Sequence, residues 1–135
     1  MGKRFLIDTN ILLEYIGGLL PTNANNLIND IFAEGFNISV INRIEVLGHP
    51  SATKIVADFI DTANQYELTP EVVSQTIEIR KVYKIKLPDA IIAATAICHN
   101  LVLISRNTKD FEKMAKLEFT AIEEKLRTPV QIPKL

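Results

Sequence analysis

Four carboxylates in this chain lie at junctions between predicted strands and helices, where chemistry is often carried out. Asp8 follows the short apolar run Phe-Leu-Ile, and Glu45 and Asp110 follow two later β-type runs. Asp89 stands at the start of an almost wholly apolar helix. If the strands are parallel, their carboxyl ends meet at one edge of the sheet, and the four acids meet with them.

Such a gathering of carboxylates calls for a cation. Two carboxylates about 4 Å apart repel by about 4 kcal/mol at an effective dielectric constant of about 20. Several of them in one crevice raise each other's pKa values unless a positive charge is present. Mg²⁺ and Mn²⁺ are the usual ions for an all-oxygen site without His or Cys. Because such an ion activates a bound water and stabilises charge on a phosphoryl oxygen, the residues predict a metal-dependent phosphodiester or phosphoryl hydrolase.

Asp8 and Asp89 also have ordinary structural explanations. Asp8 could serve only as the N-cap of the next helix, although Thr9 or Asn10 can also fill that position. Asp89 could simply interact with the dipole of its own helix, which is worth about 0.3–1 kcal/mol. Neither explanation accounts for all four acids falling at the same kind of junction.

Glu45 and Asp110 have similar alternatives. Glu45 could be a solvated helix residue paired with Arg43 or Lys54, since charged residues usually lie on solvated faces. Asp110 could belong to the acidic first turn of a short helix capped by Asn107 or the residue after it. The functional interpretation therefore depends on the acids converging in space.

The composition is that of an ordinary globular domain. The chain has 135 residues, of which 47 % are hydrophobic and 23 % charged, with a net charge of −1. This length predicts a single domain over residues 1–135. A single cysteine, Cys98, excludes an internal disulfide, and no Cys/His zinc pattern is present. No apolar run approaches the roughly 20 residues of a membrane span. The charged N-terminus leads into the first strand without a signal peptide, so we expect a cytoplasmic protein with no membrane partner.

Apolar periodicity predicts strands that alternate with helices. Ser51 is expected to cap a helix that buries Ile55, and the apolar helix that follows Pro88 should be central because it is apolar nearly all round. The expected strands cover residues 5–7, 36–41, 65–68, 101–105 and 117–121; the expected helices cover 11–16, 23–33, 44–47, 52–60, 70–83, 90–98 and 108–114, with an extended tail at 127–135. This order predicts an α/β sandwich around a mainly parallel sheet.

Four segments resemble the motifs of a PIN domain, in the family's order: FLIDTN, NRIEVLGHP, KLPDAIIAATA and LVLISRNTKDF. Within that superfamily the chain is most similar to the VapC-type toxin ribonucleases of bacterial toxin–antitoxin pairs. The resemblance extends from Phe5 to about Phe119. It implies a PIN-like three-layer α/β/α sandwich and a Mg²⁺- or Mn²⁺-dependent endoribonuclease. It also implies a protein that is commonly a homodimer and is held inactive by a small antitoxin.

The resemblance also implies a role for each of the first three acids. Asp8 and Asp89 would bind the metal directly, and Glu45 would bind metal or orient the attacking water. The family's small polar residue three positions before the second acid is Asn42 here. We expect this departure to weaken, at most, one hydrogen bond to the site.

The fourth catalytic position is open between two residues. The family places an acid or an asparagine shortly after a Thr or Ser that ends the strand, and Ser105 is that hydroxyl here. Asn107 in the fourth position would remove one negative charge and favour a single metal, whereas Asp110 would make two metals plausible. Asn10, Ser105 and Asn107 are expected to support the site in either case.

Cations near the motifs are candidates for RNA phosphate contacts, which make binding salt-dependent. An ordinary solvated charged face is the alternative. The main candidates are Arg43, Lys86, Arg106 and Lys109, and the other nearby cations are Arg80, Lys81 and Lys84.

Two other functions and one surface complete the predictions. A PIN-like module that binds RNA or protein without turnover is the main alternative to a nuclease. A phosphatase of the haloacid-dehalogenase type would need a second Asp two residues after Asp8, and that residue is Asn10. Apolar residues of the first helices either face the core or form a dimer or antitoxin surface; they are Ile11, Leu12, Tyr15, Leu19 and Leu20.

Overall fold

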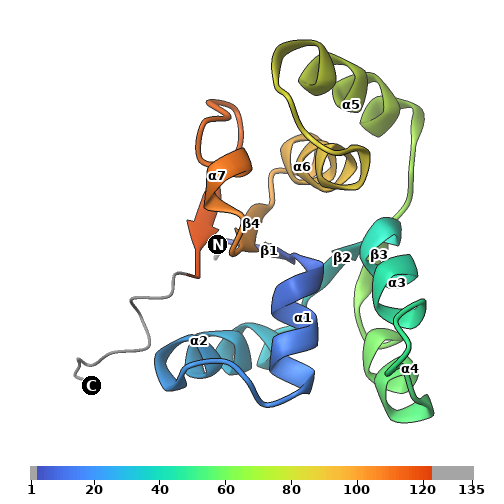
Figure 1. The fold of residues 1–135 in the computed structure, drawn as a ribbon, viewed down its shortest axis with the longest axis vertical. Coiled ribbons are helices and arrows are strands. Elements are labelled where there is room, and N and C mark those ends of the chain that lie inside the picture. The colour runs from blue at the N-terminus through green and yellow to red at the C-terminus, as the bar shows by residue number, and fades with distance from the viewer. Residues whose placement is uncertain (1–2, 123–135) are drawn as a thin grey trace.

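The computed structural model describes residues 3–122, which fold around a five-stranded sheet (Figure 1). The sheet order is β3-β2-β1-β4-β5, and every neighbouring pair of strands is parallel. The predicted parallel sheet is therefore confirmed. The strands are β1 (Phe5–Ile7), β2 (Asn37–Ser39), β3 (Asn64–Tyr66), β4 (Val102–Ser105) and β5 (Phe119–Ala121).

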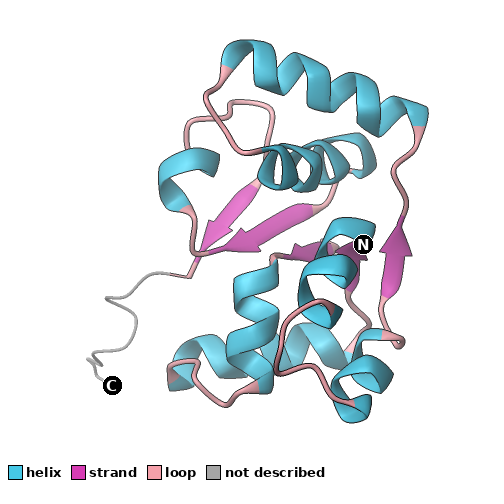
Figure 2. Cartoon of the chain, turned by 45° about the vertical axis from the view of Figure 1, so that its right-hand side comes forward, coloured by secondary structure: helices cyan, strands magenta, loops and turns pink. Residues whose placement is uncertain are grey.

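Helices cover both faces of this sheet (Figures 1 and 2). Leu6 and Leu103 pack with α6 on one face, while Ile7 and Ile104 pack with α1 and α2 on the other. Successive strand residues point to opposite faces, so one short strand supplies both cores. The predicted three-layer α/β/α sandwich is confirmed. Its helices are α1 (Thr9–Ile16), α2 (Thr22–Ala33), α3 (Val40–Leu47), α4 (Lys54–Ile60), α5 (Pro70–Val82), α6 (Leu87–His99) and α7 (Thr108–Phe111).

The sheet reverses its direction of growth next to β1. From β1 the chain moves outward through β2 and β3, then returns to place β4 on the other side of β1. Ile7 pairs with Ile104 across this junction, and the Asp8 backbone N–H donates to the Ile104 carbonyl at 2.9 Å. Ligands of open α/β sheets bind at such a switch point, beyond the carboxyl ends of the strands.

The apolar helix α6 is central, as predicted. Every residue from Ala90 to Ala96 is buried. The helix ends at Asn100, which has left-handed backbone angles with φ 54° and ψ 45°. Asparagine tolerates this conformation better than most residues with a side chain.

The second strand is shorter than predicted, because a helix begins inside the expected run of 36–41. β2 ends at Ser39, whose hydroxyl accepts from the Ile41 backbone N–H at 3.0 Å and so caps α3. Glu45 therefore lies within α3 rather than just past a strand. The apolar residues after Ser39 belong to a helix face, which periodicity over so short a run does not distinguish from a strand.

The prediction for the start of α4 is wrong. Thr53, not Ser51, caps the helix by accepting from the Val56 backbone N–H at 3.3 Å. Ser51 instead hydrogen-bonds the ring of His49 at 2.7 Å. Ile55, expected in the core, is 81 % exposed. The face of α4 that packs on the core carries Val56, Phe59 and Ile60, and Ile55 lies outside that face.

The apolar residues of the first helices mostly face the core. Ile11 and Leu12 are fully buried and Leu20 is nearly so, whereas Leu19 is 68 % exposed. The predicted tail at 127–135 lies outside the described residues. No helix in the part of the chain that the structure describes has the length and apolar character to cross a membrane.

Asn100 offers a test of this backbone geometry, because the residue is exposed and a substitution there disturbs no buried packing. Replacing Asn100 with Val should lower the free energy of unfolding by about 1–2 kcal/mol, since β-branched residues disfavour positive φ. Asn100→Gly is the matched control and should be close to neutral. Urea denaturation followed by circular dichroism measures both, and a Val variant as stable as the Gly variant would contradict the left-handed cap.

Candidate active site

Asp8 joins the end of β1 to the start of α1. Its side chain accepts hydrogen bonds from the Thr9 backbone N–H at 2.8 Å and from the Ser105 hydroxyl at 2.5 Å. Asp8 is therefore the N-cap of α1, in place of the expected Thr9 or Asn10. The bond from Ser105 is not part of any cap, so the capping role does not explain the residue fully.

Burial of Asp8 has an electrostatic consequence. The side chain is 5 % exposed, and this burial raises the pKa of its carboxyl above the ordinary value. Hydrogen bonds from the Ser105 hydroxyl and the Thr9 N–H lower this pKa, and the charge of Glu45 raises it. Asp8 and Glu45 are thus close enough to repel each other.

Glu45 lies on α3 and turns toward α1. Its Oε1 accepts from the Thr9 hydroxyl at 2.5 Å. The proposed surface partners are engaged elsewhere: Arg43 pairs with Asp61 at 2.8 Å, and Lys54 pairs with an acid of its own helix. The solvated ion-pair explanation of Glu45 is therefore wrong.

Asp89 lies in the first turn of α6 and brings the acids together. Its pKa is raised to about 6, first by burial and then by the charges of Asp8, Glu45 and Asp110, while Lys86 lowers it. A hollow of about 320 Å³ is lined by three of the four predicted acids. Its lining residues are Asp8, Thr9, Asn10, Leu13, Glu45, Asp89 and Asn107.

Asn107 faces this hollow, and Asp110 lies behind it. The Asn107 side-chain amide donates to Asp89 Oδ2 at 3.3 Å and to Asp110 Oδ2 at 3.0 Å. Its backbone N–H donates to the Ser105 hydroxyl at 2.9 Å. Among the described residues, Asn107 but not Asp110 is part of the lining. A neutral amide thus stands where the sequence left a choice between an amide and an acid.

The donor set of this hollow suits a small divalent cation. Its three carboxylates and the Thr9 hydroxyl offer oxygen ligands, and the Asn10 Oδ1 is buried without a hydrogen-bond partner within residues 3–122. In the same residues, no three His, Cys, Asp or Glu side chains are arranged to hold one ion between them. This arrangement fits Mg²⁺, which keeps several waters and is usually bound by one or two carboxylates rather than by a full protein cage.

The predicted phosphate-binding cations are placed differently from one another. Arg106 donates to Glu14 at 2.6 Å, and Arg43 is paired as described above. Lys86 is exposed, and its positive charge lowers the pKa of Asp89. Lys109 is exposed at the start of α7. Lys86 is therefore the best placed of the four to meet an anion at the acids.

Sequence reasoning missed the roles of Thr9 and Asn42. The Thr9 hydroxyl donates to Glu45, and the Asn42 side chain donates to that same hydroxyl at 3.0 Å. Asn42 was expected only to weaken a hydrogen bond, yet it makes two. The available signal was the spacing from Ser39 to Asn42, which is typical of a capping box at the start of a helix.

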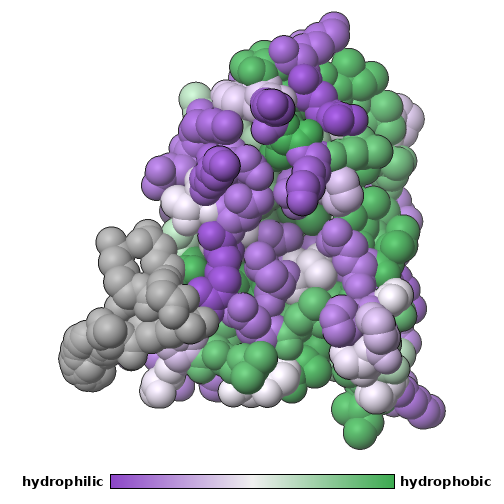
Figure 3. Space-filling model, viewed as in Figure 1, coloured by the Kyte–Doolittle hydropathy of each residue, from purple (hydrophilic) through white to green (hydrophobic). Residues whose placement is uncertain are grey.

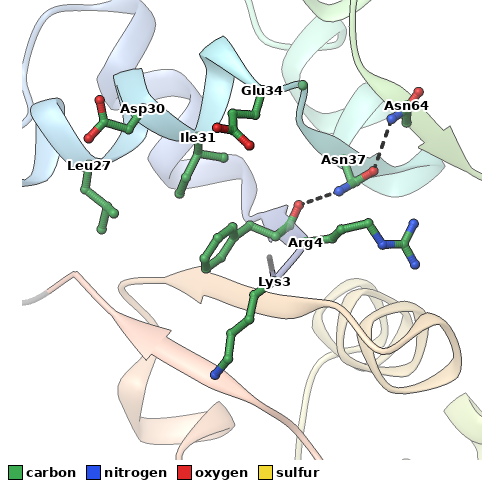
Figure 4. Close-up of a pocket in the computed structure, with 10 residues that line it drawn as sticks. Lys3, Arg4, Leu27, Asp30, Ile31, Glu34, Asn37 and Asn64 are labelled. Carbon is green, nitrogen blue, oxygen red and sulfur yellow. Dashed lines mark hydrogen bonds between the residues drawn. The ribbon is translucent and has the colours of Figure 1, made fainter. Parts of the chain in front are cut away.

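A second hollow, of about 410 Å³, lies away from the acids. Asp30 of α2 and Glu34, which directly follows that helix, line one side of it, and Arg4 lies beside β1 (Figure 4). The Arg4 guanidinium donates to the Tyr66 hydroxyl at 3.0 Å and to the His99 carbonyl at 3.3 Å. This hollow contains none of the predicted site residues.

Comparison with known proteins places the fold in a family. The sequence profile of the PIN domain matches residues 5–117. The chain belongs to the PIN domain family. No curated protein sequence matches the chain closely enough to count as a relative. The predicted resemblance of this PIN domain to VapC-like toxins is also confirmed.

Solved structures agree with this assignment. A toxin–antitoxin complex from Klebsiella pneumoniae is 32 % identical, with a TM-score of 0.70, and the match covers 84 % of this chain and 94 % of that one. VapBC2 from Rickettsia felis, bound to a promoter DNA fragment, is 20 % identical with a TM-score of 0.71, over 87 % and 97 % of the two chains. DNA-bound VapBC from Salmonella typhimurium is 20 % identical with a TM-score of 0.72, over 89 % and 98 %. The latter two support the PIN fold alone.

The raised pKa of Asp89 predicts a particular dependence of stability on pH. Because the folded-state pKa of about 6 lies above the ordinary value of 3.8, the folded state binds the proton more tightly, and stability falls as pH rises between these values. Asp89→Asn should therefore unfold at a higher temperature than the wild type above pH 7. The gain is on the order of 1 kcal/mol after solvent screening is allowed for.

Thermal melts of both proteins between pH 4 and pH 8 measure this effect. The difference between the two melting temperatures should shrink as the pH falls below about 6, the pKa of Asp89 in the folded protein. Asp30→Asn, on α2 and away from the acids, is the matched control and should leave the pH profile unchanged. A constant difference across the range would show that the pKa of Asp89 is not raised in the folded protein.

Proposed function

We propose that this PIN domain is a metal-dependent endoribonuclease that hydrolyses RNA phosphodiester bonds, and that it is the toxin of a toxin–antitoxin pair. The observation that carries the proposal is the meeting of Asp8, Glu45 and Asp89 around one hollow at the switch point of the sheet. The fold alone does not require three acids from separate elements to lie around one hollow without a positive charge between them. They do have a catalytic reason, which is the binding of a divalent cation.

In this mechanism Asp8 and Asp89 would hold Mg²⁺ or Mn²⁺, with Asn10 Oδ1 as a further oxygen. When bound, such an ion activates a water and stabilises charge on the phosphate. Glu45 would orient the attacking water and accept its proton, because Thr9 holds its Oε1 and leaves its Oε2 toward the hollow. Lys86, whose charge reaches Asp89, would contact a phosphate of the RNA.

Relatives support the biological part of the proposal. The structure from Klebsiella pneumoniae is that of a toxin–antitoxin complex, and other relatives are VapBC complexes. By analogy, this chain would bind a cognate antitoxin protein and act on RNA in the cytoplasm.

A homodimer is proposed as well, because apolar side chains remain exposed on the side of the molecule that carries α5 (Figure 3). They include Ile77 and Val82 of α5, which are 50 % and 71 % exposed. The mass of the isolated protein in solution tests this point, and a monomer at micromolar concentration would refute it.

The nuclease proposal predicts metal-dependent cleavage that requires the acids. In a mixed RNA pool, cutting should occur with Mg²⁺ or Mn²⁺ and stop with EDTA. Asp8→Asn and Asp89→Asn should each lower the rate at least about 100-fold, because each removes a charge that holds the ion. Asp30→Asn is the control that keeps the net charge of these variants and should cut normally.

The outcomes separate the proposal from its alternative. RNA that is bound but never cut, by protein free of any co-purified antitoxin, would support a catalytically silent PIN-like binding module. An Asp89→Asn variant that cuts at the wild-type rate would refute the proposed mechanism.

The neutral Asn107 in the fourth position predicts one tightly bound metal without RNA. Manganese titration followed by electron paramagnetic resonance should give a stoichiometry of one for the wild type. Asn107→Asp adds a carboxylate beside Asp89 and should tighten binding or add a second ion. Asp110→Asn should change the stoichiometry little, because Asp110 does not line the hollow. Two equal sites in the wild type would contradict this role of Asn107.

A further inference from the structure

The Thr9 hydroxyl lies between two side chains of the neighbouring helix α3. Asn42 and Glu45 are three residues apart on α3 and therefore share one face of it. The Asn42 Nδ2 donates to Thr9 Oγ1 at 3.0 Å, and Thr9 Oγ1 in turn donates to Glu45 Oε1 at 2.5 Å. The three side chains form a chain of hydrogen bonds that ends on the second acid.

The direction of this chain is fixed by its surroundings. The Asn42 Oδ1 accepts from the Ser39 backbone N–H at 2.8 Å, and a backbone N–H can only donate. The oxygen of the Asn42 amide is therefore committed to Ser39, and its NH₂ group must face Thr9. Because that group can only donate, the Thr9 hydroxyl accepts from it and gives its single proton to Glu45.

Capping of the helix does not require this arrangement. The cap of α3 uses the Ser39 hydroxyl and the Asn42 oxygen, and the Asn42 NH₂ group takes no part in it. Asn42 is fully buried, so an NH₂ group with no acceptor would be costly. The buried amide is thus explained only when its bond to Thr9 is included.

We propose that Asn42 is a positioning residue of the active site, which orients the Thr9 hydroxyl so that Glu45 is always held as an acceptor through Oε1. Among residues 3–122, the bond from the Thr9 hydroxyl is the hydrogen bond that the Glu45 carboxylate accepts. This bond uses Oε1 and leaves Oε2 available to the hollow. Thr9 also gives its backbone N–H to Asp8, so one residue fixes the first two acids relative to each other. The proposal rests on the proposed function, in which Glu45 orients water or binds metal.

A double-mutant cycle tests this chain of hydrogen bonds from Asn42 through Thr9 to Glu45, called the relay below. Asn42→Leu removes the amide at similar volume, Thr9→Val removes the hydroxyl at the same shape, and the third variant combines them. If Asn42 acts through Thr9, each single variant should lose roughly tenfold in kcat with little change in KM. The double variant should then be no slower than Thr9→Val alone, because the second change removes nothing further.

Two controls separate positioning from stability. Ser39→Ala damages the same helix cap but leaves the Asn42–Thr9 bond in place, so it should lower the melting temperature and keep kcat. Thr9→Ser restores a hydroxyl and should recover most of the loss seen with Thr9→Val. Additive effects in the cycle, or an equal loss of kcat in Ser39→Ala, would overturn the positioning role.

A readout without RNA or metal distinguishes failure of the relay from failure of the nuclease proposal. The carboxyl ¹³C chemical shift of Glu45 in the metal-free protein reports the hydrogen bond that it accepts. Asn42→Leu should move this shift in the wild-type background and leave it unchanged in the Thr9→Val background. A shift that Asn42→Leu does not move would refute the relay even in an active enzyme, and the expected pattern would support it even if no RNA is cut.

Discussion

The burial of carboxylates close to one another is the constraint on which the rest of this structure depends. Burial is the main cause of the raised pKa of Asp8 and of Asp89, and both lie close enough to Glu45 for its charge to raise the pKa further. Neutral donors offset this repulsion, and the surrounding elements are arranged to supply them: the Ser105 hydroxyl to Asp8 and the Asn107 amide to Asp89. Because the raised pKa values remain, these donors compensate only partly, which leaves the site favourable to a cation.

Much of the fold was predictable, since its strongest signals are local. The all-round apolar pattern of α6 identified the central helix, and the polar residue Asn100 indicated where this helix ends. Asp8 was recognisable as a candidate site residue because a carboxylate directly after a short buried strand lies at the sheet's edge. The gathering of Glu45 and Asp89 beside it followed from the parallel arrangement and from the family resemblance.

The parts that were not predictable depend on contacts between distant elements. The sequence does not distinguish Asn107 from Asp110 as the residue that lines the hollow, because both lie within one turn of chain. The pairing of Arg106 with Glu14, far away in sequence, left it engaged with a carboxylate rather than presented to solvent. The hydroxyl of Thr9 could be given a partner only once α3 was known to begin at Val40 and to turn Glu45 toward α1.

The pairing of β1 with β4 has a consequence for when activity can arise during protein synthesis. Asp8 and Ser105 are 97 residues apart in the sequence, yet they share a hydrogen bond. The first strand emerges from the ribosome early, but its neighbour at the switch point, β4, is made only after β2 and β3, and contacts between residues this distant in sequence form late. An unfinished chain therefore lacks an assembled acid cluster. If the protein cuts RNA, cleavage cannot begin before Ser105 has been synthesised.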